Sequence, residues 1–146
     1  MRFLTAALVV TLAAATVQAS GLQRALSEPD LNKRSKIALE NALTAYDAAR
    51  KAYDSGNLDT MATDVQEIID SVNLAKISLD QTGKDPRKSP KWFKNAEMMT
   101  RDLSRRLDAF QQDMSFADRP LLDKVKERVL QVHDDLLMGL MEGKRK

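Results

Sequence analysis

Residues 58–82 read LDTMATDVQEIIDSVNLAKISLDQT, and their apolar side chains recur at steps of three and four. The apolar positions are Leu58, Met61, Ala62, Val65, Ile68, Ile69, Val72, Ala75 and Leu79. Such steps place these side chains on one face of an α-helix, whereas a strand requires alternation. The stretch therefore predicts a long helix that buries one face.

Three further stretches show the same period, over approximately residues 28–55, 90–114 and 119–142. At ~1.5 Å per residue, each of the four helices is about 36–42 Å long. Matched lengths and two very short connections favour antiparallel neighbours. We therefore predict an all-α, up-down-up-down four-helix bundle. The alternative is a pair of helical hairpins that associate only on dimerisation.

Residues typical of helix ends separate the four stretches. Ser27 begins a capping-box variant in which Asp30 supplies the carboxylate at N3. Gly56 is expected to end the first helix, and Asn57 to cap the second. The other two starts are expected at Ser89-Pro90 and at Asp118-Arg119-Pro120.

The N-terminal stretch MRFLTAALVVTLAAATVQAS is typical of a secretory signal peptide. Arg2 supplies the positive charge, an apolar run follows, and Val17-Gln18-Ala19 fits the cleavage rule. The run of about 15 residues is short for a membrane span, which takes ~20. We expect residues 1–19 to be removed before Ser20, leaving residues 20–146 as a bundle domain in the bacterial periplasm or secreted. The alternative is a retained N-terminal anchor.

Composition excludes several classes of function. The chain of 146 residues has no cysteine, which excludes disulfide scaffolds, thiolate metal sites and covalently attached haem. Its 23 Lys and Arg against 21 Asp and Glu are too balanced for a dedicated nucleic-acid binder. It contains neither a Gly-x-Ser-x-Gly motif nor a phosphate-binding loop, so we expect no enzyme activity.

One local stretch resembles a known family. Residues 49–57, ARKAYDSGN, resemble the end of the first helix and the turn of a tetratricopeptide repeat. Met61 stands where that family has a small residue, and no second copy follows at a period of 34 residues. We interpret the stretch as the turn of a helical hairpin.

The chain has one histidine, His133, whose neighbours three and four positions away are all apolar. They are Val129, Leu130, Leu136 and Leu137. We interpret His133 as a residue at the edge of the core, with Asp134 and Asp135 pointing elsewhere. The alternative is a haem or metal ligand, because an exported four-helix bundle with a histidine on its last helix resembles the b-type haem bundles. That resemblance implies a methionine ligand on the first helix, where none stands, so we expect no cofactor and no metal.

The bundle is expected to have one basic end and one acidic end. The start of the first helix, the connection before the third helix and the C-terminus share an end, which collects Lys33, Arg34, Lys36, Lys84, Arg87, Lys88, Lys91, Lys94, Lys144, Arg145 and Lys146. Trp92 and Phe93 lie within this end, and a basic patch beside aromatic residues suits an anionic surface. We predict that the binding residues are Lys84, Arg87, Lys88, Lys91, Trp92 and Lys94.

The sequence therefore predicts an exported, non-enzymatic binding or adaptor module of the cell envelope. The expected partner is an anionic envelope component or an acidic protein, and not a nucleic acid. The module is expected to be a monomer or a homodimer. The alternatives are a lysine-rich end that is only solvated, and a cofactor carrier that uses His133.

Overall fold

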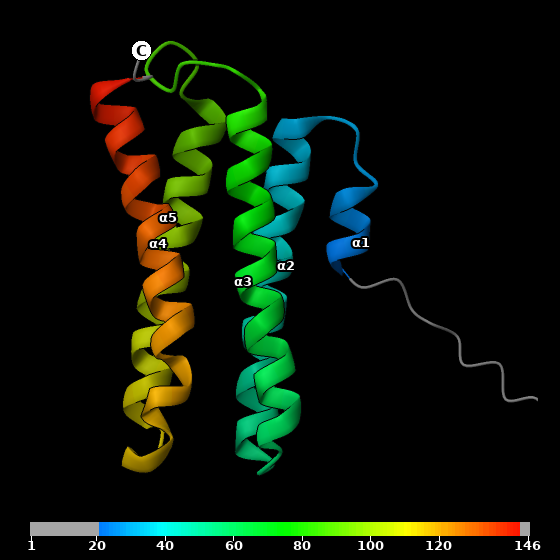
Figure 1. The fold of residues 1–146 in the computed structure, drawn as a ribbon, viewed down its shortest axis with the longest axis vertical. Coiled ribbons are helices and arrows are strands. Elements are labelled where there is room, and N and C mark those ends of the chain that lie inside the picture. Colours follow the sequence, from blue (N-terminus) through cyan, green and yellow to red (C-terminus); the bar gives the residue numbers. More distant parts are fainter. Residues whose placement is uncertain (1–20, 144–146) are drawn as a thin grey trace, which may run out of the picture.

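The computed structural model of the chain describes residues 21–143. The expected signal peptide and its cleavage site before Ser20 lie outside the described residues, as do Lys144, Arg145 and Lys146. The described part is helical and contains no strand (Figure 1). Its elements are α1 (Gly21–Leu26), α2 (Leu31–Asp54), α3 (Leu58–Gln81), α4 (Lys91–Asp113), the 3-10 helix η1 (Phe116–Leu122) and α5 (Asp123–Glu142).

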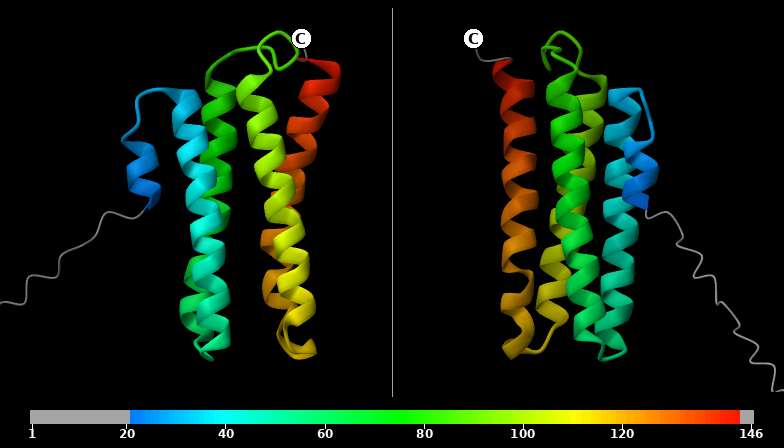
Figure 2. Two further views of the ribbon diagram at one scale, coloured as in Figure 1. Left: turned by 180° about the vertical axis from the view of Figure 1, so that it is seen from behind. Right: turned by 45° about the vertical axis from the view of Figure 1, so that its right-hand side comes forward.

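The four long helices lie side by side and alternate in direction along the chain (Figures 1 and 2). Helices α2 and α3 form one antiparallel hairpin, and α4 and α5 form another. The hairpins pack so that α2 lies beside α4 and α3 beside α5, while α3 and α4 contact each other little. Consecutive helices α3 and α4 are therefore diagonal, and the 82–90 connection crosses the end of the bundle.

The helices joined by the two short connections are antiparallel, as expected, but two other pairs of neighbours are parallel. The neighbours α2 and α4 both run away from the end that holds the 82–90 connection, and α3 and α5 both run toward it (Figure 1). The turn at residues 55–57 is too short for its helices to separate, which forces them to be neighbours. The longer 82–90 segment permits a diagonal crossing.

The N-terminal boundary of α2 differs from the prediction. Asp30, rather than Ser27, is the N-cap, because its carboxylate accepts hydrogen bonds from the backbone N–H groups of Asn32 (2.9 Å) and Lys33 (3.2 Å). The Ser27 hydroxyl instead donates to the Gln23 carbonyl at the end of α1. The sequence reading had missed this short helix, whose Ala25 is buried.

The other boundaries agree in part. Asn57 caps α3 as predicted, because its side-chain oxygen accepts from the Thr60 N–H (3.1 Å), and Gly56 has the positive φ of a helix terminus. Ser89 makes no cap, since Pro90 occupies the N-cap position of α4 without a side-chain hydrogen bond. The predicted start at Asp118-Arg119-Pro120 falls within η1, and α5 begins only at Asp123.

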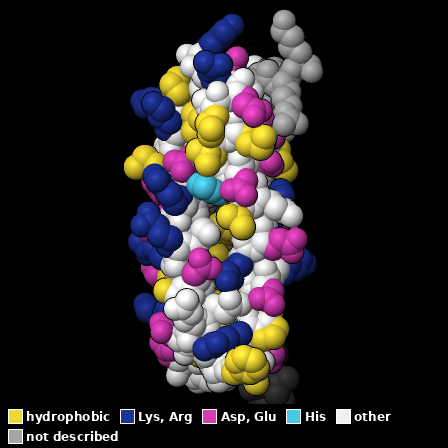
Figure 3. Space-filling model, turned by 90° about the vertical axis from the view of Figure 1, so that its left-hand side faces the viewer, with side chains coloured by type: hydrophobic (Ala, Val, Ile, Leu, Met, Phe, Trp, Pro, Cys, Tyr) yellow, Lys and Arg dark blue, Asp and Glu magenta, His cyan; other side chains and the backbone are white. Residues whose placement is uncertain are grey.

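The core contains most of the predicted stripes of the four long helices, but Leu58 and Ala62 at the start of α3 are exposed. Its largest fully buried side chains are Phe110, Leu39, Met61, Ile68, Leu79, Leu103, Leu107, Leu122, Val72, Val125, Val129 and Val132. Charged side chains cover much of the outer face of α4 and α5 (Figure 3).

None of the helices within residues 21–143 has a stretch apolar and long enough to cross a membrane.

Candidate functional site

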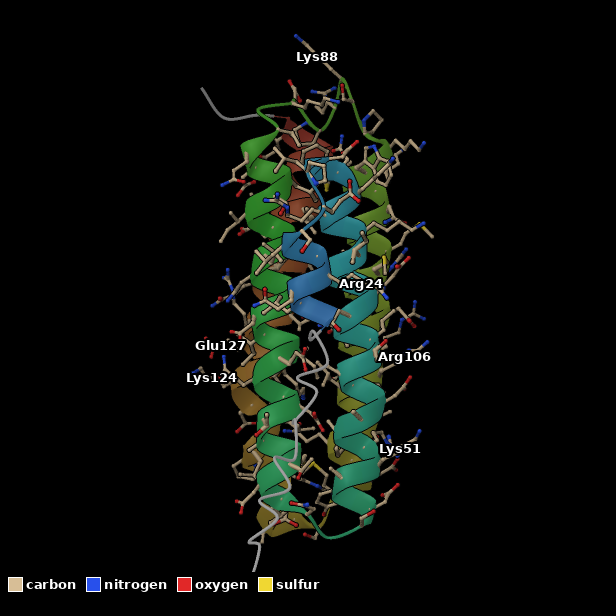
Figure 4. The ribbon with its side chains drawn as sticks, turned by 90° about the vertical axis from the view of Figure 1, so that its right-hand side faces the viewer. Arg24, Lys51, Lys88, Arg106, Lys124 and Glu127 are labelled. Carbon is tan, nitrogen blue, oxygen red and sulfur yellow. The ribbon has the colours of Figure 1, made fainter. Side chains whose placement is uncertain are left out.

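The structure brings the six predicted binding residues together at one end of the bundle. Lys84, Arg87 and Lys88 lie in the 82–90 connection, and all three are exposed. Lys91 and Lys94 are exposed on the first turn of α4, which leaves that connection. Figure 4 shows Lys88 at the tip of the connection, pointing away from the bundle. We call Lys84, Arg87, Lys88, Lys91 and Lys94 the basic end.

Local contacts hold the 82–90 connection in place. The Asp85 carboxylate accepts a hydrogen bond from the Arg87 N–H (2.9 Å), and the Asp85 carbonyl accepts from the N–H groups of Lys88 and Ser89. Pro86 packs against α5 at Gly139, where a Cβ would lie 3.2 Å from the proline ring. The connection is thus fixed on its inner side while its cationic side chains face outward.

The cations of the basic end have no acidic partner among residues 21–143. No carboxylate there lies within ion-pair distance of Lys84, Arg87, Lys88, Lys91 or Lys94. In contrast, Lys36 at the start of α2 pairs with Glu40 (3.7 Å), and Arg34 donates to the Glu28 carbonyl. Five cations without a carboxylate partner in the described residues therefore lie close together on the connection and on the first turn of α4.

The two aromatic residues of this end are not both accessible. Phe93 is buried in the core, whereas Trp92 is half-buried and packs against it. The Lys91 ammonium lies 5.1 Å from the centre of the Trp92 ring, a cation–π distance. An exposed aromatic pair beside the basic patch is thus absent from this part of the structure, and Trp92 alone borders the basic end.

The sequence reading missed that the positive charge continues along α4. Lys91, Lys94, Met98, Arg101 and Arg105 are all exposed and follow one another at steps of three and four. This spacing places them on one face of the helix. Lys and Arg side chains accordingly gather along one side of the α4–α5 face, beside the histidine (Figure 3). The spacing itself was the signal that could have revealed the stripe.

His133 has acidic neighbours that the sequence did not predict. Its Nε2 lies 3.1 Å from the Glu97 carboxylate of α4, and its Nδ1 lies 3.2 Å from Asp134. The expectation that Asp134 points elsewhere is therefore wrong. Glu97 also lies 3.5 Å from the Arg101 guanidinium, and the His133 side chain is only 14% exposed. Both ring nitrogens thus face carboxylates, which suits a structural link between α4 and α5.

No group of three potential metal-binding side chains occurs within residues 21–143. A b-type haem requires a free histidine nitrogen at its iron, and both nitrogens of His133 lie against carboxylates. The residues around His133 therefore do not fit a haem or metal site.

A pocket of about 490 Å³ opens near the basic end, between the end of α3, the 82–90 connection and α5. Leu79, Phe93 and Leu136 form its apolar floor. Its rim mixes the ion pair of Lys76 and Asp80 (2.7 Å) with further charges of both signs, namely Lys84, Asp135 and Glu142. Because the rim carries both positive and negative side chains, its charge does not indicate whether a ligand would be an anion or a cation.

The opposite end of the bundle is acidic and is partly neutralised by ion pairs. Arg50 pairs with Asp113 (2.8 Å), and this hydrogen bond, followed by that to Tyr46, raises the pKa of Arg50. Partial burial raises the pKa of Asp64, and the negative charge of Glu67 adds to the effect. The charges at this end are therefore partly paired, unlike the cations of the basic end.

Comparison with known proteins gives no identification, since no protein-family model, curated protein or solved structure matches the chain.

Proposed function

We propose that the chain is an exported, non-enzymatic binding module of the bacterial cell envelope, and that its basic end contacts an anionic surface. One observation carries this proposal. Five exposed cations project from one end, and none has an acidic partner within the described residues. The N-terminal sequence supports export, because it has the charge, apolar run and cleavage motif of a signal peptide.

An unpaired cationic cluster attracts anionic groups over a distance set by the salt concentration. The Debye length falls from ~10 Å at 0.1 M to ~3 Å at 1 M, so binding should weaken strongly as salt is added. Each exposed Lys or Arg near an anionic membrane contributes ~1 kcal/mol. Reversal of three charges should therefore weaken binding by more than about tenfold.

The test compares the exported protein with a variant that carries Arg87→Glu, Lys88→Glu and Lys91→Glu. Binding is measured by co-sedimentation with vesicles of phosphatidylglycerol and phosphatidylcholine, and separately by retention on immobilised envelope extract, at low and high salt. We expect the variant to lose binding in at least one assay while its circular dichroism is unchanged.

The matched control reverses three other exposed charges, Arg24→Glu, Lys51→Glu and Lys124→Glu. These residues lie on α1, α2 and α5, away from the basic end (Figure 4). The control has the same net charge as the first variant, so a general charge effect would weaken both equally. Equal binding by the wild type and the basic-end variant in both assays would overturn the proposal.

The alternative use of His133 for haem or metal has weaker support, because both of its ring nitrogens lie against carboxylates. An absorption spectrum of protein purified from its native host tests this alternative directly. A Soret band would establish haem binding and would contradict our proposal.

A further inference from the structure

The basic stripe of α4 includes one exposed apolar side chain. Met98 is 58% exposed and lies between Lys94 and Arg101 in the stripe defined above. Lys91 and Arg105 lie at its two ends, about 21 Å apart at ~1.5 Å per residue. This face of α4 is therefore long, positively charged and apolar near its middle.

A second stripe runs along α5 and contains three exposed apolar side chains, with the exposed Asp134 between the first and the second of them. Leu130, Leu137 and Met141 are 49%, 39% and 68% exposed. Their spacing of seven and four places them on one face of the helix. The buried positions of α5, such as Val129 and Leu136, belong to a different face. Exposed leucine and methionine side chains in a row indicate a contact surface, because single exposed apolar residues are normally scattered.

The two stripes flank the same groove between α4 and α5. His133 contacts Glu97 across this groove, and Lys126 pairs with Asp108 (2.9 Å) further along it. In Figure 3, basic side chains lie on one side of the histidine, an acidic side chain lies on the other, and apolar side chains lie above and below it. We call this surface the α4–α5 outer face, formed by Lys91, Lys94, Met98, Arg101 and Arg105 of α4 with Leu130, Leu137 and Met141 of α5.

The charges of this face favour an anionic partner. Its carboxylates are Glu97, Asp108 and Asp134, and each lies beside a partner: Glu97 and Asp134 lie against His133, with Glu97 also near Arg101, and Asp108 pairs with Lys126. Lys91, Lys94 and Arg105 have no carboxylate partner within the described residues.

A second copy of the chain fits this face poorly. A two-fold dimer would place the same surface on both sides of the interface, and the like charges would repel.

We propose that the α4–α5 outer face lies flat on a bilayer that contains anionic phospholipid. Leucine and methionine side chains enter the boundary between headgroups and acyl chains, while the lysine and arginine side chains extend to the phosphates. The basic end lies at one edge of the same surface, and its cations bind headgroups there. This inference rests on the proposed function and names the partner as a lipid surface.

The test removes the apolar contribution without changing the charge. The exported protein is compared with Leu137→Gln/Met141→Gln, using vesicles of phosphatidylglycerol and phosphatidylcholine at low salt. Glutamine keeps the helix propensity close to that of the original residues. We expect binding to fall by at least about tenfold, because the inserted apolar area is lost. The matched control is Leu26→Gln/Ile77→Gln, which changes two other exposed apolar residues, on α1 and α3, and should bind as the wild type does.

A second measurement reports the depth of insertion. The chain has no cysteine, so Met141→Cys can carry one environment-sensitive fluorophore, and Ile77→Cys provides the control position. Emission should shift to shorter wavelength on vesicle binding only for the label at position 141. An unshifted label at 141, together with full binding of the glutamine variant, would overturn the inference.

The outcomes separate this inference from the proposed function. If the glutamine variant binds normally while the Arg87→Glu/Lys88→Glu/Lys91→Glu variant does not, the flat orientation is wrong and the basic-end function stands. Another outcome is that the wild type fails to bind vesicles and yet is retained on envelope extract, with retention lost in the Arg87→Glu/Lys88→Glu/Lys91→Glu variant. In that case the partner is not a lipid surface. If Leu137→Gln/Met141→Gln converts a dimer to a monomer in light scattering, the face is a self-interface and the bilayer proposal falls.

Discussion

The Tyr46 hydroxyl donates a hydrogen bond to the backbone carbonyl of Arg106 at 2.9 Å, and this bond joins α2 to its parallel neighbour α4. The Tyr46 ring meets the Phe110 ring edge-on, with centroids 5.9 Å apart. The Arg50 guanidinium lies 5.0 Å from the same Phe110 ring. The two hairpins are therefore joined by a polar and aromatic cluster as well as by aliphatic packing.

Replacing Tyr46 with phenylalanine should lower the free energy of unfolding by about 0.5–1.5 kcal/mol. The ring contact with Phe110 is retained, while the Arg106 carbonyl loses its side-chain donor. Urea denaturation followed by circular dichroism measures the change. An unchanged midpoint would show that water satisfies this carbonyl equally well.

Leu107 tests the packing of the core. It is fully buried on α4, so Leu107→Ala should lose about 2–4 kcal/mol through lost burial and the cavity left behind. The control is Leu130→Ala on the exposed face of α5, where the loss should stay below about 0.5 kcal/mol. Similar losses at both positions would contradict the assignment of buried faces.

Asp64 is expected to make stability depend on pH. Partial burial, and then the charge of Glu67, raise the pKa of Asp64 in the folded state. Ionised Asp64 at neutral pH therefore lowers the free energy of unfolding. That cost disappears as the pH falls through the raised pKa. Asp64→Asn should therefore be more stable than the wild type at pH 7, and the two should converge in acid.

Thermal unfolding across a pH series measures the difference at Asp64. Asp47→Asn, at an exposed position of α2, controls for the exchange of a carboxylate for an amide. A constant difference between Asp64→Asn and the wild type at every pH would contradict the pKa argument.

Helix capping distinguishes the observed boundary of α2 from the predicted one. Asp30→Ala should lower the free energy of unfolding by about 1 kcal/mol, because two backbone N–H groups lose their acceptor. Ser27→Ala should have a smaller effect, since its exposed hydroxyl donates only to the Gln23 carbonyl. Chemical denaturation of both variants measures the two losses, and the reverse order would support Ser27 as the cap.

Export predicts a defined mature N-terminus. Processing after Ala19 should leave Ser20 as the first residue of the exported protein, because Val17-Gln18-Ala19 fits the cleavage rule. Intact-mass spectrometry of protein from the periplasmic or culture fraction tests this directly. A mass that includes residues 1–19 would establish a retained anchor.

Sequence periodicity predicted the long helices and most of their buried faces, but not the order of neighbours. A stripe such as Val65, Ile68 and Val72 shows that a face is buried without showing which helix covers it. The diagonal placement of α3 and α4 depends on the path of the 82–90 connection, which carries no periodic signal. Helix α1 was missed because six residues are too few to show a period.

The candidate site was predictable where it is continuous in sequence. Residues 84–94 form one connection and one helical turn, so the cations of the basic end had to lie together. The contact of His133 with Glu97 joins positions 36 apart, and only the fold brings them together. The apolar residues of the α4–α5 outer face, such as Leu137 and Met141, were missed because they combine with a stripe from another helix.

The diagonal 82–90 connection also affects how two molecules can combine. It is the one segment through which the backbone passes from the α2–α3 hairpin to the α4–α5 hairpin. If this segment straightens, two chains can exchange hairpins and retain every contact between helices, with only residues 82–90 changing conformation. Pro86 against Gly139 and the Asp85 hydrogen bonds keep the segment folded back, so they favour the closed monomer over a domain-swapped dimer.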